Sequence, residues 1–352
     1  MLNNQDLDAA VKSGVITAEQ ASALRRKTTT PTFGGETETP RVTRGFNDVL
    51  LALGTALIGL ALMSQWFASG RTISPAVFAT IPVLWVISEI LDVRRKAVLP
   101  GIVAVIGMSL AAAYIGARAS YMIGTEPQLD NSFGAMIKLP ARVLFAGGAT
   151  VALANAAYYA RFRLPFALLP LALGIGIAAT NALVLAFGWE KTAAIPHILG
   201  LAFGCVLFAA AMKFDTSDPR RQTRAADCGF WLHLAAAPLI VHSLLSIFGG
   251  TALARSGIGS GFTVALITSL TLIALIIDRR ALIVSSLSYL LAAVGYVVTN
   301  VTQALGGSIF ASLLVIGIIV LIVGMGWHPA RRLILAPFRG QSWLAKLPPV
   351  QA

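Results

Sequence analysis

Two histidines lie in an apolar segment of helix length, GFWLHLAAAPLIVHSLLSIFG, at residues 229–249. His233 and His242 are separated by about 180° of ideal helix rotation, so they face opposite sides of the segment. Pro238, between them, removes one helical hydrogen bond and predicts a kink. Imidazoles inside a membrane either form a working site or hydrogen-bond to neighbouring helices. The second interpretation is the simpler one.

Two further ionisable residues are candidates for an intramembrane polar site. His197 lies near the outer end of the sixth predicted span, at a depth where it could meet His242. Glu89 lies one turn from the inner end of the second span, near Asp92, and we expect it to form an interfacial ion pair. No carboxylate is predicted at mid-membrane, which weakens models of transport coupled to a central Asp or Glu.

The residue patterns do not indicate a metal site, a cofactor site or an enzyme. Two histidines without a carboxylate or thiolate partner bind metal poorly. The sequence has no GxxxxGK[ST], HExxH, GxSxG or strand-linked GxGxxG motif. Both cysteines, Cys205 and Cys228, fall in apolar runs and are expected to be inert thiols. We therefore expect a non-enzymatic protein with no metal and no cofactor.

The composition is that of an integral membrane protein. Charged residues make up 12% of the chain, hydrophobic residues 57%, and the mean hydropathy is +0.78. Soluble domains carry about twice that share of charge. The net charge of +12 fits loops that face anionic lipid at the cytoplasmic side better than it fits nucleic-acid binding.

Continuous apolar runs of about 20 residues, each long enough to cross a bilayer as a helix, predict an all-α transmembrane bundle. The runs do not alternate, so strands are not expected. The ten predicted spans are approximately 47–67, 73–92, 98–117, 142–160, 164–187, 193–212, 229–249, 261–278, 281–301 and 308–327.

The distribution of basic residues predicts that both termini lie in the cytoplasm. With alternating spans and an internal N-terminus, 21 of the 27 Lys and Arg residues fall on the inner side and six on the outer side. Such an excess follows the positive-inside rule. The six outer residues are Arg71, Arg118, Lys138, Arg142, Lys191 and Arg255.

Short basic turns recur on the inner side, at 92–101, 160–170 and 278–286, with a longer version at 213–224 that contains Asp215. A duplication of helical hairpins would produce this pattern. The positive-inside rule alone would also produce it, and this is the simpler interpretation.

The soluble ends are short. Residues 1–27 predict a cytoplasmic helical hairpin, with Gly14 in the left-handed region after the first helix and Thr17 and Gln20 forming a capping box. A hairpin of this size has no independent core, so it needs a partner: the membrane surface, a second copy or another protein. Residues 28–45 predict a flexible linker to the bundle at 46–327. The basic amphipathic tail, 328–352, suits the lipid headgroup region.

Some residues within the spans suit helix packing. Gly200 and Gly204 form a GxxxG pattern that permits close helix approach. Asn155 is expected to hydrogen-bond between helices, and Trp327 is placed where an aromatic belt would lie.

The segment GVITAEQASAL, followed by a linker and many apolar spans, resembles a family of predicted bacterial multi-pass inner-membrane proteins of unknown function that have a short N-terminal helical domain. The segments FWLHLAAAPLIVH and DRRALIVSSLSYLLAAVGY add to this resemblance. It implies a bacterial inner membrane and supplies no site residues.

The sequence leaves two functions open. One is a non-enzymatic scaffold or envelope component that docks through residues 1–27. The alternative is a transporter or permease for a small or lipidic solute, with prolines such as Pro238 breaking the helices.

Overall fold

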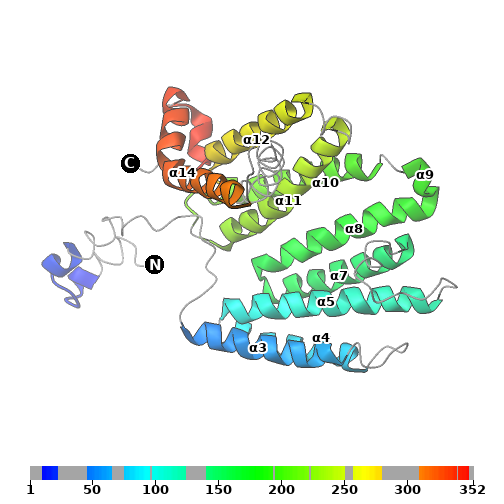
Figure 1. Ribbon diagram of the computed structural model, residues 1–352. Helices are drawn as coiled ribbons and strands as arrows, with labels where there is room; N and C mark the ends of the chain where they lie inside the picture. Colours follow the sequence, from blue (N-terminus) through cyan, green and yellow to red (C-terminus); the bar gives the residue numbers. More distant parts are fainter. Residues whose placement is uncertain are drawn as a thin grey trace. The chain divides into compact units, whose positions relative to one another are not determined.

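The computed structural model describes residues 10–22, 46–65, 75–95, 97–123, 140–192, 195–221, 223–249, 257–279, 309–338 and 340–348. The chain divides into two units, Met1–Thr39 and Pro40–Ala352, and the long helices belong to the second (Figure 1). Every regular element in these ranges is helical, which confirms the all-α class for this part of the chain.

The second unit consists mainly of long helices with short helical turns at some of their ends (Figure 1). The long helices are α3 (Phe46–Ser64), α4 (Pro75–Ser88), α5 (Val98–Ile123), α7 (Ala141–Phe162), α8 (Leu168–Phe187), α10 (Ile195–Ser217), α11 (Arg224–Gly249), α12 (Gly257–Ile277) and α14 (Ile309–Leu335). The short elements are the π-helical turn η1 (Glu89–Arg94), the 3-10 turns η2 (Pro165–Ala167), η3 (Ala336–Phe338) and η4 (Ser342–Lys346), and the one-turn helix α9 (Trp189–Thr192).

Seven helical stretches within the described residues are long and apolar enough to cross a membrane, and they coincide with the first seven predicted spans. Helices α12 and α14 occupy the eighth and tenth predicted spans. The ninth, 281–301, lies outside the described residues. This is the architecture of a multi-pass membrane protein, while the count of ten remains a prediction.

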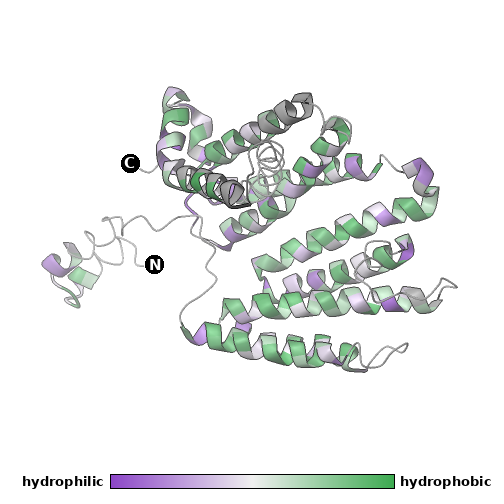
Figure 2. Cartoon of the chain, in the orientation of Figure 1, coloured by the Kyte–Doolittle hydropathy of each residue, from purple (hydrophilic) through white to green (hydrophobic). Residues whose placement is uncertain are grey.

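The outer surface of the helices is apolar, as a lipid environment requires. Leu60, Leu153, Val206 and Leu333 each expose more than half of their surface. Figure 2 shows apolar residues along most of the long helices from α3 to α11, with hydrophilic residues gathered near the helix ends.

Glycines allow α7 and α8 to pack with their backbones close together. A Cβ atom on Gly148 would lie 2.8 Å from the backbone nitrogen of Ala178 and 2.9 Å from the carbonyl oxygen of Gly174. A Cβ on Gly174 would meet the backbone of α7 equally closely. Only glycine fits at this helix crossing, because any side chain would overlap backbone atoms that cannot move aside.

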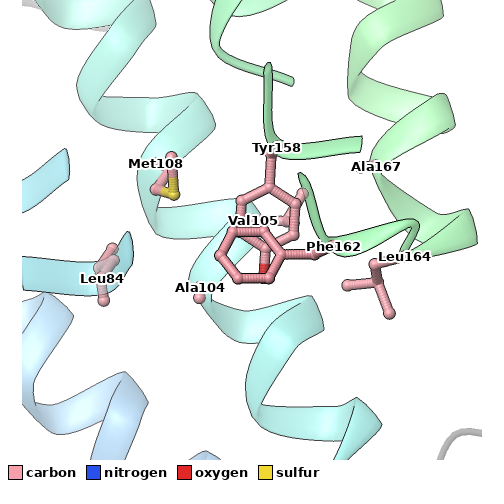
Figure 3. Close-up of a cluster of buried hydrophobic side chains, with 8 residues drawn as sticks. All are labelled: Leu84, Ala104, Val105, Met108, Tyr158, Phe162, Leu164 and Ala167. Carbon is pink, nitrogen blue, oxygen red and sulfur yellow. The ribbon is translucent and has the colours of Figure 1, made fainter. Parts of the chain in front are cut away.

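A buried cluster joins α4, α5, α7 and η2 (Figure 3). Tyr158 and Phe162 pack with their ring centroids 4.4 Å apart, and Trp85 meets Phe162 edge to face at 5.1 Å. Val105 and Met108 of α5 pack into the same cluster. This cluster holds α4, α5 and α7 together near the turns η1 and η2.

One end of the bundle carries several of the basic loops, and we call it the basic end; it holds Arg94, Arg161, Arg221 and Arg279. Contacts across it join elements that are distant in sequence. Arg161 pairs with Glu89, and the rings of Phe166 and Trp231 meet edge to face at 4.8 Å. The α4–α5, α7–α8 and α10–α11 hairpins therefore turn at the same end.

The described part of the N-terminal unit contains the local structure expected from its sequence. The Thr17 amide donates to Gln20 Oε1 at 2.9 Å, and the Gln20 amide donates to Thr17 Oγ1 at 3.2 Å. Gly14 has φ +72°. The capping box and the left-handed glycine are thus confirmed.

The substitution Gly148→Ala should destabilise the bundle by about 1–3 kcal/mol, because the added methyl group overlaps the backbone of α8. Thermal unfolding of the purified chain in detergent measures the effect. Gly54→Ala is the matched control, since a Cβ at Gly54 has no heavy atom within 4 Å. Equal unfolding temperatures for the two variants would contradict the close α7–α8 contact.

Candidate functional site

A buried ionic cluster, built from Asp215, His233 and Arg279, lies where α10, α11 and the end of α12 meet. Asp215 Oδ2 accepts from Arg279 Nε at 2.9 Å and lies 2.9 Å from His233 Nε2, while Arg279 Nη2 pairs with Asp215 Oδ1. Arg279 also donates to the carbonyl of Ala226 at 3.1 Å. His233 is completely buried. The carboxylate is thus held by two cationic or protonatable groups from two other segments.

A second set of buried polar contacts surrounds Asp278, next to Arg279. Trp327 Nε1 donates to Asp278 Oδ1 at 2.8 Å, and Arg221 Nη1 lies 3.4 Å from Asp278 Oδ2. Arg331 donates to the carbonyls of Leu275 and Pro348, at 3.1 and 2.7 Å. Asp278 has φ +56°, so the chain turns sharply there and presents Asp278 and Arg279 to different neighbours. These contacts tie α12 and α14 to the α10–α11 hairpin.

The structure corrects the expectation that Asp215 belongs to a cytoplasmic loop. Helix α10 continues to Ser217, past the predicted end of the span at 212. Asp215 extends the buried stripe of Gly204, Leu207 and Ala211, whose spacing of three and four residues marks one helix face. That stripe was the signal in the sequence for a buried carboxylate.

Sequence reasoning also missed the partners of this carboxylate. Arg279 is 64 residues away from Asp215, and nothing local to α10 indicates it. Trp327 was expected at the membrane interface, yet it exposes only 2% of its surface and bonds to Asp278. An indole N–H in an apolar environment needs an acceptor, and the nearest one lies inside the bundle.

A second carboxylate is held at the basic end of the first helices. Tyr158 Oη lies 2.7 Å from Asp92 Oδ2 and 2.8 Å from Ser88 Oγ. A Cβ on Gly101 would lie 2.5 Å from Asp92 Oδ2, just as one on Gly229 would lie 2.4 Å from Asp215 Oδ1. In both hairpins, an Asp near the end of one helix packs against a glycine near the start of the next.

Glu89 forms the interfacial ion pair expected of it, but its partner comes from another helix. Arg161 of α7 pairs with Glu89, and the two side chains are 48% and 37% exposed. A pair with this exposure contributes little to stability where solvent screens it.

The other two candidate histidines lie together, away from the basic end. The ring centroids of His197 and His242 are 5.8 Å apart, so α10 and α11 hold them at the same depth. His242 is exposed whereas His233 is buried, as expected of opposite faces of α11. The helix continues through Pro238, and the alanines on its N-terminal side, Ala235 to Ala237, are almost fully buried.

A cavity of about 540 Å³ lies between α8, α10 and α11, and both histidines line it. Its other polar lining residues are Thr180, Asn181 and Ser243. Toward the basic end, the same three helices close on each other through an apolar cluster that includes Ala172, Leu207, Ala211, Leu232, Ala235 and Ala236. The cavity therefore ends at this apolar cluster. The ionic cluster lies on the other side of it, because Asp215 follows Ala211 by one helical turn and His233 follows Leu232 directly.

Gly200 and Gly204 lie on the face of α10 that packs against α11. A Cβ on Gly200 would lie 2.6 Å from Ser243 Oγ, and one on Gly204 would lie 2.8 Å from Ile240 Cγ1. Between α5 and α7, Asn155 Nδ2 donates to Ser109 Oγ at 2.9 Å. These residues lie at close contacts between helices.

Within the described ranges, no group of three or more His, Cys, Asp and Glu side chains is arranged to hold a metal ion. Cys228 is buried, with Sγ 3.6 Å from Tyr159 Oη, and Cys205 is exposed. The two polar features that remain are the ionic cluster and the histidine-lined cavity.

Comparison of the chain with family models, with curated proteins and with solved structures finds no match.

The substitution Asp215→Asn should lower the free energy of unfolding by about 3–5 kcal/mol, because it leaves the Arg279 guanidinium buried without a full counter-charge. Chemical or thermal unfolding in detergent measures the loss. Glu89→Gln is the control and should cost about 0–1 kcal/mol, since its pair is half exposed. If the two variants lose equal stability, the Asp215 cluster does not hold the helices together.

Proposed function

We propose that the chain is a transporter or permease that takes a small or lipidic solute into the cavity between α8, α10 and α11. The observation that carries the proposal is the cavity itself, which has polar side chains from all three helices. A protein that moves a solute needs such a cavity, closed at one end at a time.

The contacts below the cavity fit the closed end of a transporter. Ala211 and Leu232, both buried, pack in the apolar cluster at its base. Asp215 and His233, each within one helical turn of those residues, belong to the ionic cluster with Arg279. Two successive layers, one apolar and one ionic, therefore separate the cavity from the basic end.

The scaffold function stands as the competing hypothesis, and it predicts a dry bundle. The buried carboxylate at Asp215 favours the transporter over the scaffold. An intramembrane ion pair is costly and is usually associated with a solute or ion pathway. In this proposal the chain is not an enzyme, because the cavity carries histidines and hydroxyls without an activating carboxylate among its lining residues.

The proposal includes the orientation and the location. The basic end faces the cytoplasm of a bacterium, against the anionic lipids of the inner membrane. The cavity then opens toward the outer side, and residues 1–27 lie in the cytoplasm, where they are available to a protein partner.

Cysteine labelling tests the cavity. In a background with Cys205→Ala and Cys228→Ala, Thr180→Cys should react with a membrane-impermeant charged thiol reagent applied from the outer side, because Thr180 lines the cavity. Thr80→Cys is the matched control, since Thr80 is completely buried in α4, and it should stay unreacted.

Labelling rates in right-side-out and inside-out membrane vesicles measure the difference. If Thr180→Cys reacts no faster than Thr80→Cys from either side, while the protein remains folded and inserted, then the bundle is dry. That result would favour the scaffold.

Reporter fusions test the orientation. Green fluorescent protein fused after Ala352 should fluoresce, and alkaline phosphatase fused at the same point should be inactive, because the phosphatase needs disulfides that form only outside the cytoplasm. The reverse pattern would place the basic end outside and overturn the proposed direction of the cavity.

A further inference from the structure

We infer that the cavity between α8, α10 and α11 binds a single-chain amphiphile whose head is a weak acid, such as a carboxylate or a phosphate ester. This inference rests on the proposed function and names its substrate class. It depends on two sets of cavity-lining residues. His197, His242 and Ser243 would bind the head of the ligand, and apolar side chains of α8 and α10 would contact its tail.

The polar side of the cavity offers hydrogen-bonding groups to a ligand. Ser243 exposes only 2% of its surface and lines the cavity. His197 and His242 also line it, with their ring centroids 5.8 Å apart. A hydroxyl can donate and accept hydrogen bonds, and a neutral imidazole has one donor and one acceptor, so these groups suit a ligand whose head carries oxygen atoms.

The charge around these groups favours an acid over a base. None of the lining residues is Asp, Glu, Lys or Arg. No lining carboxylate therefore repels an anionic head, and each imidazole has a ring N–H that can donate to it. His197 is in the first turn of α10, which begins at Ile195, and helix N-termini favour negative charge.

The rest of the cavity wall is apolar and meets the lipid-facing surface. Leu173 and Ile177 of α8 and Val206 of α10 line the cavity, and they are 45%, 45% and 63% exposed. In a membrane these side chains contact hydrocarbon, so the cavity joins a polar pocket to the lipid tails. An acyl chain would lie along this side while its head meets the histidines.

The volume limits the ligand to one small molecule. About 540 Å³ falls within the range of about 300–1,000 Å³ that is usual for pockets binding drug-sized ligands. A single-chain acid fits this volume better than a two-chain phospholipid held in full.

Equilibrium binding to the full chain in phosphatidylcholine nanodiscs tests the inference, with radiolabelled dodecanoate and dodecanol as probes and empty nanodiscs as the background. Dodecanoate should bind at least about tenfold tighter than dodecanol, because hydrogen bonds to a charged group are stronger than those to a hydroxyl. His197→Gln and His242→Gln should each weaken dodecanoate binding by about tenfold.

Two serine variants provide the matched control. Ser243→Ala should weaken dodecanoate binding, whereas Ser269→Ala should not, because the Ser269 hydroxyl bonds only within its own helix, to the Ala265 carbonyl at 2.8 Å. Unfolding temperatures close to that of the unsubstituted chain establish that the variants are folded.

The outcomes distinguish a membrane lipid from a free acid as the ligand. They also distinguish failure of this inference from failure of the proposed function. If lysophosphatidic acid, a single-chain membrane lipid, displaces dodecanoate from the nanodiscs, the acidic head is supported and the occupant is a membrane lipid; if it does not, the occupant is a free acid. Equal binding of dodecanoate and dodecanol, no binding of dodecanoate, or unchanged binding in both histidine variants would overturn the inference. Labelling of Thr180→Cys would still support a transporter in each of those cases.

Discussion

The carboxylate of Asp215 is the constraint on which the arrangement of the later helices depends. A charged group buried among transmembrane helices is stable only when opposite charges and hydrogen-bond donors surround it. Arg279 and His233 provide them, from segments 64 and 18 residues away. Because all three side chains are nearly inaccessible, α10, α11 and the end of α12 must meet at one point. The neighbouring contacts of Asp278 extend the same constraint to α14.

Close backbone contacts set the spacing of the remaining helices. Gly148 and Gly174 bring α7 and α8 together, and Gly204 brings α10 against α11. Small residues stabilise such pairs because lipid provides no hydrophobic driving force between helices. The α8 helix meets the α10–α11 pair through the apolar cluster nearer the basic end. Beyond that cluster, side chains leave the space that His197 and His242 line. Tight packing at one end thus creates the cavity at the other.

The proposed permease and its ligand follow from this asymmetry. The ionic cluster stabilises the closed basic end, while the cavity is lined by histidine, hydroxyl and amide side chains. The Asp92 and Asp215 hairpins share one device, an Asp packed against a glycine of the following helix. The first carboxylate bonds to hydroxyl groups of Tyr158 and Ser88, whereas the second bonds to ionisable groups. Among the described residues, the charged network of Asp215 thus lies in the same part of the bundle as the cavity.

The sequence by itself determined the class and the first seven spans, because apolar runs of bilayer length have only one stable form in lipid. It also determined local features such as the Thr17–Gln20 capping box, which depends on residues three positions apart. The meeting of His197 and His242 could be anticipated from the depth of each residue in its predicted span. Tertiary structure alone decided the partners of Asp215 and the burial of Trp327. It also decided that Glu89 forms its ion pair with Arg161. Those contacts depend on which helix faces lie together, and periodicity within one helix does not encode its neighbours. The cavity is decided in the same way, since it forms between α8 and the α10–α11 pair.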